Sequence, residues 1–193
     1  VIDSNDFAGR KLLATGNGRC NFTNKNFSFD FFQSSDPEFY KYVLNNFTNE
    51  DLIKYFNDLG IDTTSLPSGR CYPSTMSART VRDILYLKAK ENAKFIFNEK
   101  IIDINLDKKL LIGENNKYKY DILILAGGGI TLKNSGSDGT IFKILEKYHP
   151  VSKISYGITN YKTKEKLSKA AKGSRVNAKV SLYIDLSLIH ISD

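Results

Sequence analysis

The stretch "GRKLLATGNGRCNFTN", residues 9–24, decides how the rest of this chain is interpreted. A Rossmann phosphate turn needs G-x-G-x-x-G directly after a strand, but Asn21 stands where the third glycine belongs. A P-loop is excluded, because no Gly-Lys-Ser or Gly-Lys-Thr follows. Gly16 and Gly18 instead predict a loop that lets the backbone approach a partner closely. The positive charges of Arg10, Lys11 and Arg19 suit an anionic ligand such as a pyrophosphate. An ordinary glycine turn with solvated basic residues explains this stretch equally well.

Two further glycine clusters favour the ligand interpretation. Residues 120–125, "YDILIL", are nearly continuously apolar, which predicts a strand buried on both faces of a parallel sheet. The strand leads into residues 126–129, "AGGG", at the sheet edge where open α/β folds bind their ligands. Residues 136–139, "GSDG", then precede a predicted helix, whose first N–H groups favour anions. Three such features in one chain indicate a nucleotide cofactor.

Apolar periodicity predicts four helices, within residues 36–47, 48–60, 77–90 and 139–149. Asp36 is the expected cap of the first helix, and Thr48 with Asp51 resembles a capping box at the second. Ser77 is the expected cap of the third helix, and Gly60 is the expected left-handed stop of the second. The side chains expected to face the core are Phe39, Tyr42, Val43 and Phe47; Leu52, Tyr55, Phe56 and Leu59; Val81, Ile84 and Leu85; and Ile141, Ile144 and Leu145.

Short β-rich runs at residues 95–97, 101–106 and 110–112 predict a small meander that leads into the buried strand. The composition becomes lysine-rich from about residue 159, and residues 175–185 alternate like a strand. We therefore expect a second domain to begin at residue 159.

Composition limits the possible functions. The chain has 193 residues, 41% hydrophobic and 25% charged, and no apolar run approaches the roughly 20 residues of a membrane helix. The formal charge of +7 is spread over the sequence instead of clustering on one element, which argues against a nucleic-acid partner. Cys20 and Cys71 form no CxxC pair, and His149 and His190 have no metal-ligand spacing. These observations predict a cytoplasmic protein without a metal centre or membrane segment.

Three segments together resemble a known family: "GRKLLATGNGRCNFTN", "GRCYPSTMSARTV" and "DILILAGGGITLKNSGSDGTIFKIL". In order and spacing they are similar to the signature segments of the BaiN-type NAD(P)/FAD-dependent oxidoreductases, from Val1 to about Asp185. The resemblance implies a Rossmann-like α/β domain that binds FAD, with NADH or NADPH as electron donor. It also implies hydride transfer through the flavin to a small organic substrate, such as an enone.

The resemblance also implies roles for individual residues. Asp3 matches the acidic residue that binds the adenosine ribose, so the first strand and its GxGxxG turn are expected upstream of Val1. The other implied cofactor-binding residues are Gly18; Arg10 and Lys11 near phosphate or ribose; Arg19, Cys20 and Asn21 near the flavin; Ile101 near adenine; and Ala126, Gly127 and Gly128 near FAD. An incomplete domain of this kind is expected to retain FAD weakly or not at all when expressed alone.

Departures from the family pattern concern the substrate side. Gly127 replaces the usual Thr, and residues 130–135, "ITLKNS", replace the usual segment that contains Ser-Tyr-Pro. Tyr72 is the one candidate proton donor, although a buried anchor explains it as well. Cys20 lacks a partner cysteine nearby and fits a small buried residue beside the flavin better than a redox thiol.

The sequence thus predicts an incomplete FAD-binding domain over residues 1–158 and the start of a substrate-side domain over residues 159–185. Residues 186–193, "LSLIHISD", match a reading frame of a transposon end used in sequencing libraries, and we expect an artefactual tail. A non-catalytic basic binding module is the alternative, because it would explain the charge of +7 directly. Neither the substrate nor the oligomeric state follows from the sequence.

Overall fold

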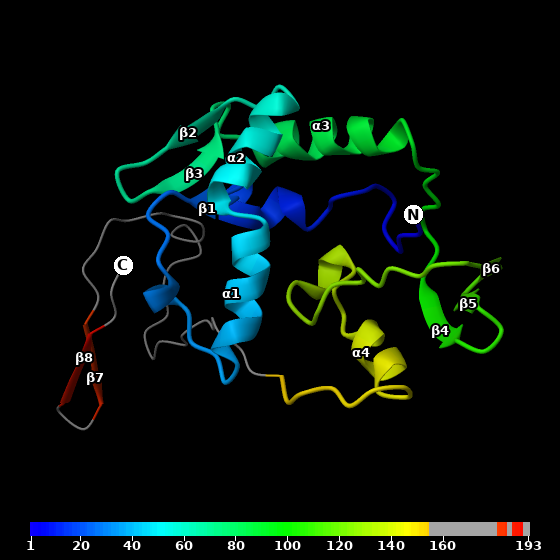
Figure 1. The fold of residues 1–193 in the computed structure, drawn as a ribbon. Coiled ribbons are helices and arrows are strands. Elements are labelled where there is room, and N and C mark those ends of the chain that lie inside the picture. The colour runs from blue at the N-terminus through cyan, green and yellow to red at the C-terminus, as the bar shows by residue number, and fades with distance from the viewer. Residues whose placement is uncertain (155–180, 185–186, 191–193) are drawn as a thin grey trace, which may run out of the picture. The chain divides into compact units, whose positions relative to one another are not determined.

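The computed structural model describes residues 1–154, 181–184 and 187–190 (Figure 1). The chain divides into two compact units, Val1–Ser152 and Lys153–Asp193. Most of the expected second domain, including the lysine-rich segment, lies outside the described residues, so its boundary at residue 159 stays a prediction. No helix in the described part of the chain is both long and apolar enough to cross a membrane.

The first half of the larger unit combines short helices with a small antiparallel sheet. Its strand order is β1-β3-β2, and Cys71 of β3 lies opposite Thr23 of β1 and Ser65 of β2. The elements, in chain order, are the 3-10 helix η1 (Leu12–Gly18), β1 (Thr23–Asn24), the 3-10 helix η2 (Phe29–Phe31), α1 (Pro37–Asn46), α2 (Asn49–Asp58), β2 (Thr63–Ser65), β3 (Arg70–Pro73) and α3 (Ala78–Lys90).

Local capping chemistry explains where these helices begin and end. The Asp36 carboxylate accepts a hydrogen bond from the Phe39 N–H at 3.2 Å, and Thr48 with Asp51 forms a reciprocal capping box. Gly60, with φ of +81°, ends α2 in the left-handed conformation. These three predictions are confirmed. Ser77 precedes α3 as expected, but its side chain makes no capping hydrogen bond.

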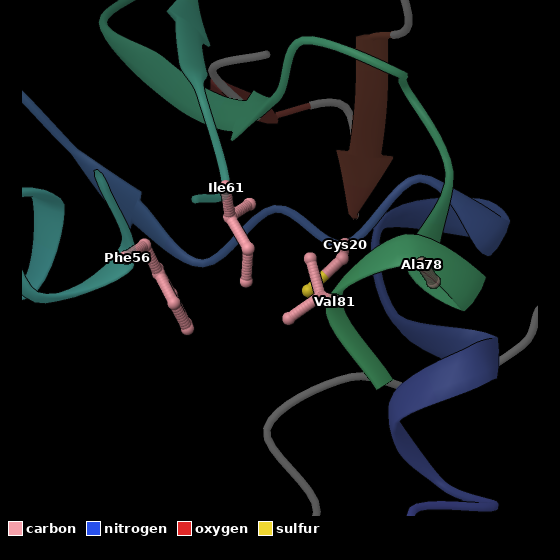
Figure 2. Packing of buried hydrophobic residues seen from close by; sticks show 5 residues of the cluster. All are labelled: Cys20, Phe56, Ile61, Ala78 and Val81. Carbon is pink, nitrogen blue, oxygen red and sulfur yellow. The ribbon is translucent and has the colours of Figure 1, made fainter. Parts of the chain in front are cut away.

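A hydrophobic core joins α2, α3 and the loop after η1. Figure 2 shows its five buried members, Cys20, Phe56, Ile61, Ala78 and Val81. Val81 is fully buried and Ile61 is 1% exposed. Further partly buried side chains pack against them, including the predicted Leu52, Leu59, Ile84 and Leu85. The predicted core faces of α2 and α3 are therefore confirmed, except for Tyr55, which is exposed.

The predicted core face of α1 is wrong. Phe39 and Tyr42 are 68% and 71% exposed, and Val43 and Phe47 are exposed as well. Helix α1 packs through Tyr40 instead, whose ring stacks on Phe32 with centroids 5.4 Å apart. The face of α1 that packs against the preceding aromatic residues is therefore not the face that its apolar spacing predicts.

The second half of the larger unit is a meander with one short helix. Strands β4 (Ile101–Asn105), β5 (Leu110–Gly113) and β6 (Lys117–Lys119) pair antiparallel in that order, with a bulge between Ile101 and Asp103. Ile144 of α4 (Thr140–Leu145) packs into a core with Ile104 and Leu111. The Tyr148 hydroxyl also donates to the Ile104 carbonyl. The predicted runs at residues 101–106 and 110–112 are confirmed as β4 and β5, whereas the predicted run at residues 95–97 is wrong, because only an isolated bridge forms there, at Ile96.

The predicted buried strand at residues 120–125 is wrong. That segment forms no strand, and Ile122 and Ile124 are 86% and 84% exposed. A doubly covered strand needs neighbouring strands to pair with, and no sheet in the described part of the chain includes this segment. Parallel pairing among the described residues is limited to a single bridge between Ile2 and Ile96. The fold of residues 1–154 is mixed α/β with small antiparallel sheets, and these residues do not form the parallel sheet that the sequence predicts.

The smaller unit contributes one hairpin. Strand β7 (Ser181–Ile184) pairs antiparallel with β8 (Ser187–His190), and Ser181 lies opposite His190. Strand β7 falls within the predicted strand at residues 175–185. Strand β8 falls within the suspected tail, whose origin stays a prediction.

Candidate functional site

The N-terminal segment runs beside the stretch that leads into the meander. The Asp3 N–H donates to the Ile96 carbonyl at 2.9 Å, and the Ile96 N–H donates to the Val1 carbonyl at 2.9 Å. These two bonds form the parallel bridge noted above. Asp3 thus stands just after a short parallel pairing, as expected for an acidic residue at the end of a strand.

The Asp3 carboxylate is held through one of its two oxygens. Its Oδ1 accepts from the Asn5 N–H at 2.9 Å and from Asn5 Nδ2 at 2.8 Å. The same Asn5 amide donates to the Ser135 carbonyl at 3.1 Å, which brings the glycine-serine turn to the N-terminal segment. Within the described residues, the other oxygen of Asp3, Oδ2, has no hydrogen-bond partner and can accept from a ligand.

The two predicted phosphate-binding cations lie next to this group. Arg10 Nη1 reaches the Asn5 side-chain oxygen at 3.4 Å and the Asp6 carboxylate at 3.5 Å. Lys11 Nζ donates to the Ser137 hydroxyl at 3.3 Å. Lys11 therefore faces the turn at residues 135–139, whereas Arg10 lies beside Asn5 and Asp6 of the N-terminal segment.

The glycine segment 126–129 approaches the same turn most closely at Gly128, where there is no room for a side chain. A Cβ on Gly128 would lie 2.5 Å from the Ser137 hydroxyl, and its φ of +73° disfavours other residues. The Gly139 N–H donates to the Gly129 carbonyl at 3.1 Å, which joins the two glycine clusters. Gly127 adjoins Ile141 of α4, and Ala126 is exposed. The close approach at Gly128 is to the chain's own Ser137, so contact of this segment with a ligand stays a prediction.

The expected anion preference at the start of α4 is satisfied inside the protein. Asp138 Oδ1 accepts from the Thr140 N–H at 3.0 Å, and Asp138 Oδ2 pairs with Lys100 at 2.6 Å. The Lys100 ammonium and the Thr140 N–H hold the pKa of the Asp138 carboxyl well below its usual range. The chain's own carboxylate thus accepts from the first N–H of the helix, and anion binding by the other N–H groups at this helix start stays a prediction.

A second group forms around the loop after η1. The Arg19 guanidinium lies 5.0 Å from the centroid of the Tyr72 ring, and Arg19 Nε donates to the Gly16 carbonyl at 3.3 Å. With its amide nitrogen toward two carbonyls, Asn21 donates to Thr23 and Cys71 at 3.0 and 3.1 Å. The exposed Gly18 has a φ of +80°, which helps the chain turn here.

Cys20 lies beneath this loop in the core. It is 2% exposed and adopts a φ of +60°, which is uncommon for a residue with a side chain. Burial raises the pKa of its thiol, although a hydrogen bond with the Thr15 side chain opposes that effect. A buried thiol with a raised pKa is a poor nucleophile, which agrees with the expected packing role.

The predicted site residues therefore fall into three places. Asp3, Arg10, Lys11 and Gly128 belong to one connected group, whereas Gly18, Arg19, Cys20, Asn21 and Tyr72 lie around the second loop. Ile101 packs in the meander core, and its neighbour Lys100 pairs with Asp138 of the turn. The sequence did not indicate Asn5, which links Asp3 to Ser135, or single out Ser137 within its glycine turn.

The first group fits a dinucleotide such as FAD. It offers a carboxylate oxygen for ribose hydroxyls and two cations for phosphates. We call Asp3, Asn5, Arg10, Lys11, Gly128, Ser135 and Ser137 the Asn5 group.

Comparison with known proteins points in the same direction. The family model "HI0933-like protein Rossmann domain" matches residues 1–174. The chain is 30% identical over 185 residues to a 3-dehydro-bile acid delta(4,6)-reductase from Clostridium scindens. This match covers 94% of this chain and 45% of that protein. It is 29% identical over 151 residues to the ribosomal RNA dihydrouridine synthase of Escherichia coli, and 26% over 154 residues to that of Haemophilus influenzae. Each of these two matches covers 77% of this chain and 38% of the relative. The chain thus spans less than half the length of these relatives.

Proposed function

The chain belongs to the HI0933-like Rossmann-domain family, and from that membership we propose that it binds FAD in an NAD(P)H-dependent oxidoreductase. The observation that carries this proposal is the Asn5 group. Residues up to 130 positions apart meet there in an arrangement suited to a dinucleotide: Asn5 contacts Ser135, and both Lys11 and Gly128 contact Ser137. When bound, FAD would supply the hydride chemistry.

The residues of this chain would bind and orient the cofactor. Asp3 Oδ2 would accept hydrogen bonds from the adenosine ribose, as acidic residues do at the corresponding place in Rossmann folds. Arg10 and Lys11 would neutralise the pyrophosphate, and Gly128 would let the backbone approach the cofactor closely. Arg19 and Asn21, ordered by Tyr72 and Cys71, would face the flavin end.

We further propose that the substrate is a small organic molecule with a carbon–carbon double bond conjugated to a carbonyl. The names of the relatives support this, because a delta(4,6)-reductase of 3-dehydro-bile acids and a dihydrouridine synthase both saturate such a bond. Uridine within RNA is a second candidate substrate. It is favoured by two relatives named ribosomal RNA dihydrouridine synthase.

The test is a visible spectrum of the purified protein, expressed from its full natural reading frame, before and after anaerobic addition of NADH or NADPH. We expect a flavin spectrum that either nucleotide bleaches. A colourless protein that cannot be reconstituted with FAD would overturn the proposal and favour a basic binding module.

Two lysine variants sharpen this test. Lys11→Met removes the cation that contacts Ser137, whereas Lys41→Met removes a surface cation that pairs with Glu38 at the same distance of 3.3 Å. We expect Lys11→Met to lower flavin retention and Lys41→Met to leave it unchanged. Reoxidation by a bile-acid enone or by a uridine-containing RNA would then distinguish the two substrate candidates.

A further inference from the structure

Asn5 is buried, with 9% of its surface exposed, and each of its polar groups has a partner. Its backbone N–H and its Nδ2 both donate to Asp3 Oδ1, at 2.9 and 2.8 Å. Its Nδ2 also donates to the Ser135 carbonyl, and its Oδ1 accepts from Arg10. Its own carbonyl accepts from the Asn98 N–H at 2.9 Å. Asn5 therefore joins three segments that are far apart in the sequence.

The two bonds from Asn5 to a single oxygen fix the Asp3 carboxylate. Because Oδ1 is engaged twice, rotation of the carboxylate would break two hydrogen bonds at once. The other oxygen, Oδ2, is left in a defined position. A carboxylate held in this way can accept from ribose hydroxyls without first losing side-chain freedom.

Asn5 also sets the position of the turn that carries Ser137. A Cβ on Gly136 would lie 2.9 Å from Asn5 Nδ2 and 3.0 Å from the Ser4 hydroxyl, so the turn packs directly against this amide. Ser137, one residue further along, receives the hydrogen bond from Lys11. The position of Asn5 thus bears on both the carboxylate and a cation of the site.

Only an amide meets all these requirements. An aspartate at position 5 would place a second carboxylate against Asp3 and against the Ser135 carbonyl, where the structure needs donors. An alanine would leave the Ser135 carbonyl and the Arg10 guanidinium without this partner.

We propose that Asn5 is a positioning residue that sets Asp3 and the turn at residues 135–137 for the adenosine end of the cofactor. The inference rests on the FAD binding proposed above. It predicts selectivity, because FMN has the same flavin but lacks the adenosine that Asp3 would bind.

The test measures the affinity of the full-length apoprotein for FAD and for FMN by flavin fluorescence, together with its thermal unfolding. The variants are Asn5→Asp, Asn5→Ala and, as a matched control, Asn116→Asp. Asn116 Nδ2 donates to Glu99 Oε2 at 3.2 Å on the meander, so its replacement also brings two carboxylates together.

We expect both Asn5 variants to weaken FAD binding about ten- to a hundredfold. FMN binding should stay within about twofold in these variants, and Asn116→Asp should leave both affinities near those of the unsubstituted protein. Loss of FAD and FMN affinity in equal measure would show a purely structural role and overturn the inference, as would unchanged FAD affinity. If the unsubstituted protein binds no FAD, the proposed function itself fails, and this inference fails with it.

Discussion

The guanidinium of Arg19 lies over the ring of Tyr72, 5.0 Å from its centroid, and thereby joins the loop after η1 to strand β3. Tyr72 is 2% exposed, so its ring is enclosed by protein. Of the two interpretations that the sequence leaves open, this burial favours the anchor over the proton donor.

Replacement of Tyr72 separates those two interpretations. We expect Tyr72→Phe to keep turnover within about threefold, because the ring and its contact with Arg19 remain. Tyr72→Leu removes the aromatic face and should lower the free energy of unfolding by about 1–3 kcal/mol. Steady-state kinetics and urea unfolding of both variants measure these effects. A loss of turnover by more than about a hundredfold in Tyr72→Phe would identify the hydroxyl as a proton donor.

Substitution of two glycines with similar φ can separate the energetic cost of backbone strain from that of side-chain crowding. Gly60 and Gly128 have φ of +81° and +73°, but only a Cβ on Gly128 would meet another atom, Ser137 Oγ at 2.5 Å. We expect Gly60→Ala to cost about 1 kcal/mol in unfolding free energy and Gly128→Ala to cost clearly more. Adding Ser137→Ala to Gly128→Ala should recover part of that difference. Equal costs in urea unfolding would show that the close approach has no energetic effect.

The Lys100–Asp138 pair predicts a dependence of stability on pH. The pKa of Asp138 is lower in the folded protein than in the unfolded chain, so the pair's contribution is fully present above the unfolded value of about 4. It is lost progressively as the pH falls below that value. We expect Lys100→Met to flatten this acid limb in thermal unfolding measured from pH 6 to pH 2. Lys54→Met, which removes a surface pair with Asp58, should leave the limb unchanged.

Core and surface apolar side chains should differ sharply in their effect on stability. Ile61 is 1% exposed, and its replacement by Ala should cost about 2–5 kcal/mol in unfolding free energy. Phe39 of α1 is 68% exposed, and Phe39→Ser should change that free energy by less than about 0.5 kcal/mol. Denaturant titrations of the two variants provide the comparison. A large cost for Phe39→Ser would mean that α1 packs through the face that the sequence predicts.

Features set by neighbouring residues were predictable from the sequence. The Asp36 cap, the Thr48–Asp51 capping box and the Gly60 stop each depend on a few adjacent positions, and all three are confirmed. The family assignment was also predictable, because its motifs are local in sequence.

Features that depend on a distant partner were not predictable. The apolar spacing of α1 could not show that the helix would pack against Phe32 through Tyr40. The apolar run at residues 120–125 has the composition of a central strand, but a strand forms only where another is available to pair with it. The sequence did not indicate a role for Asn5, because its hydrogen bond to Ser135 forms only in the folded chain.

The hydrogen bond between Asn5 and Ser135 spans 130 residues of chain. During synthesis on the ribosome, the N-terminal segment therefore emerges long before its partner turn exists. Closing such a long loop is entropically costly and slow compared with forming a helix. The helices and the core around Ile61 can form first from residues already made, whereas the candidate cofactor site is completed only when the turn at residues 135–139 has emerged.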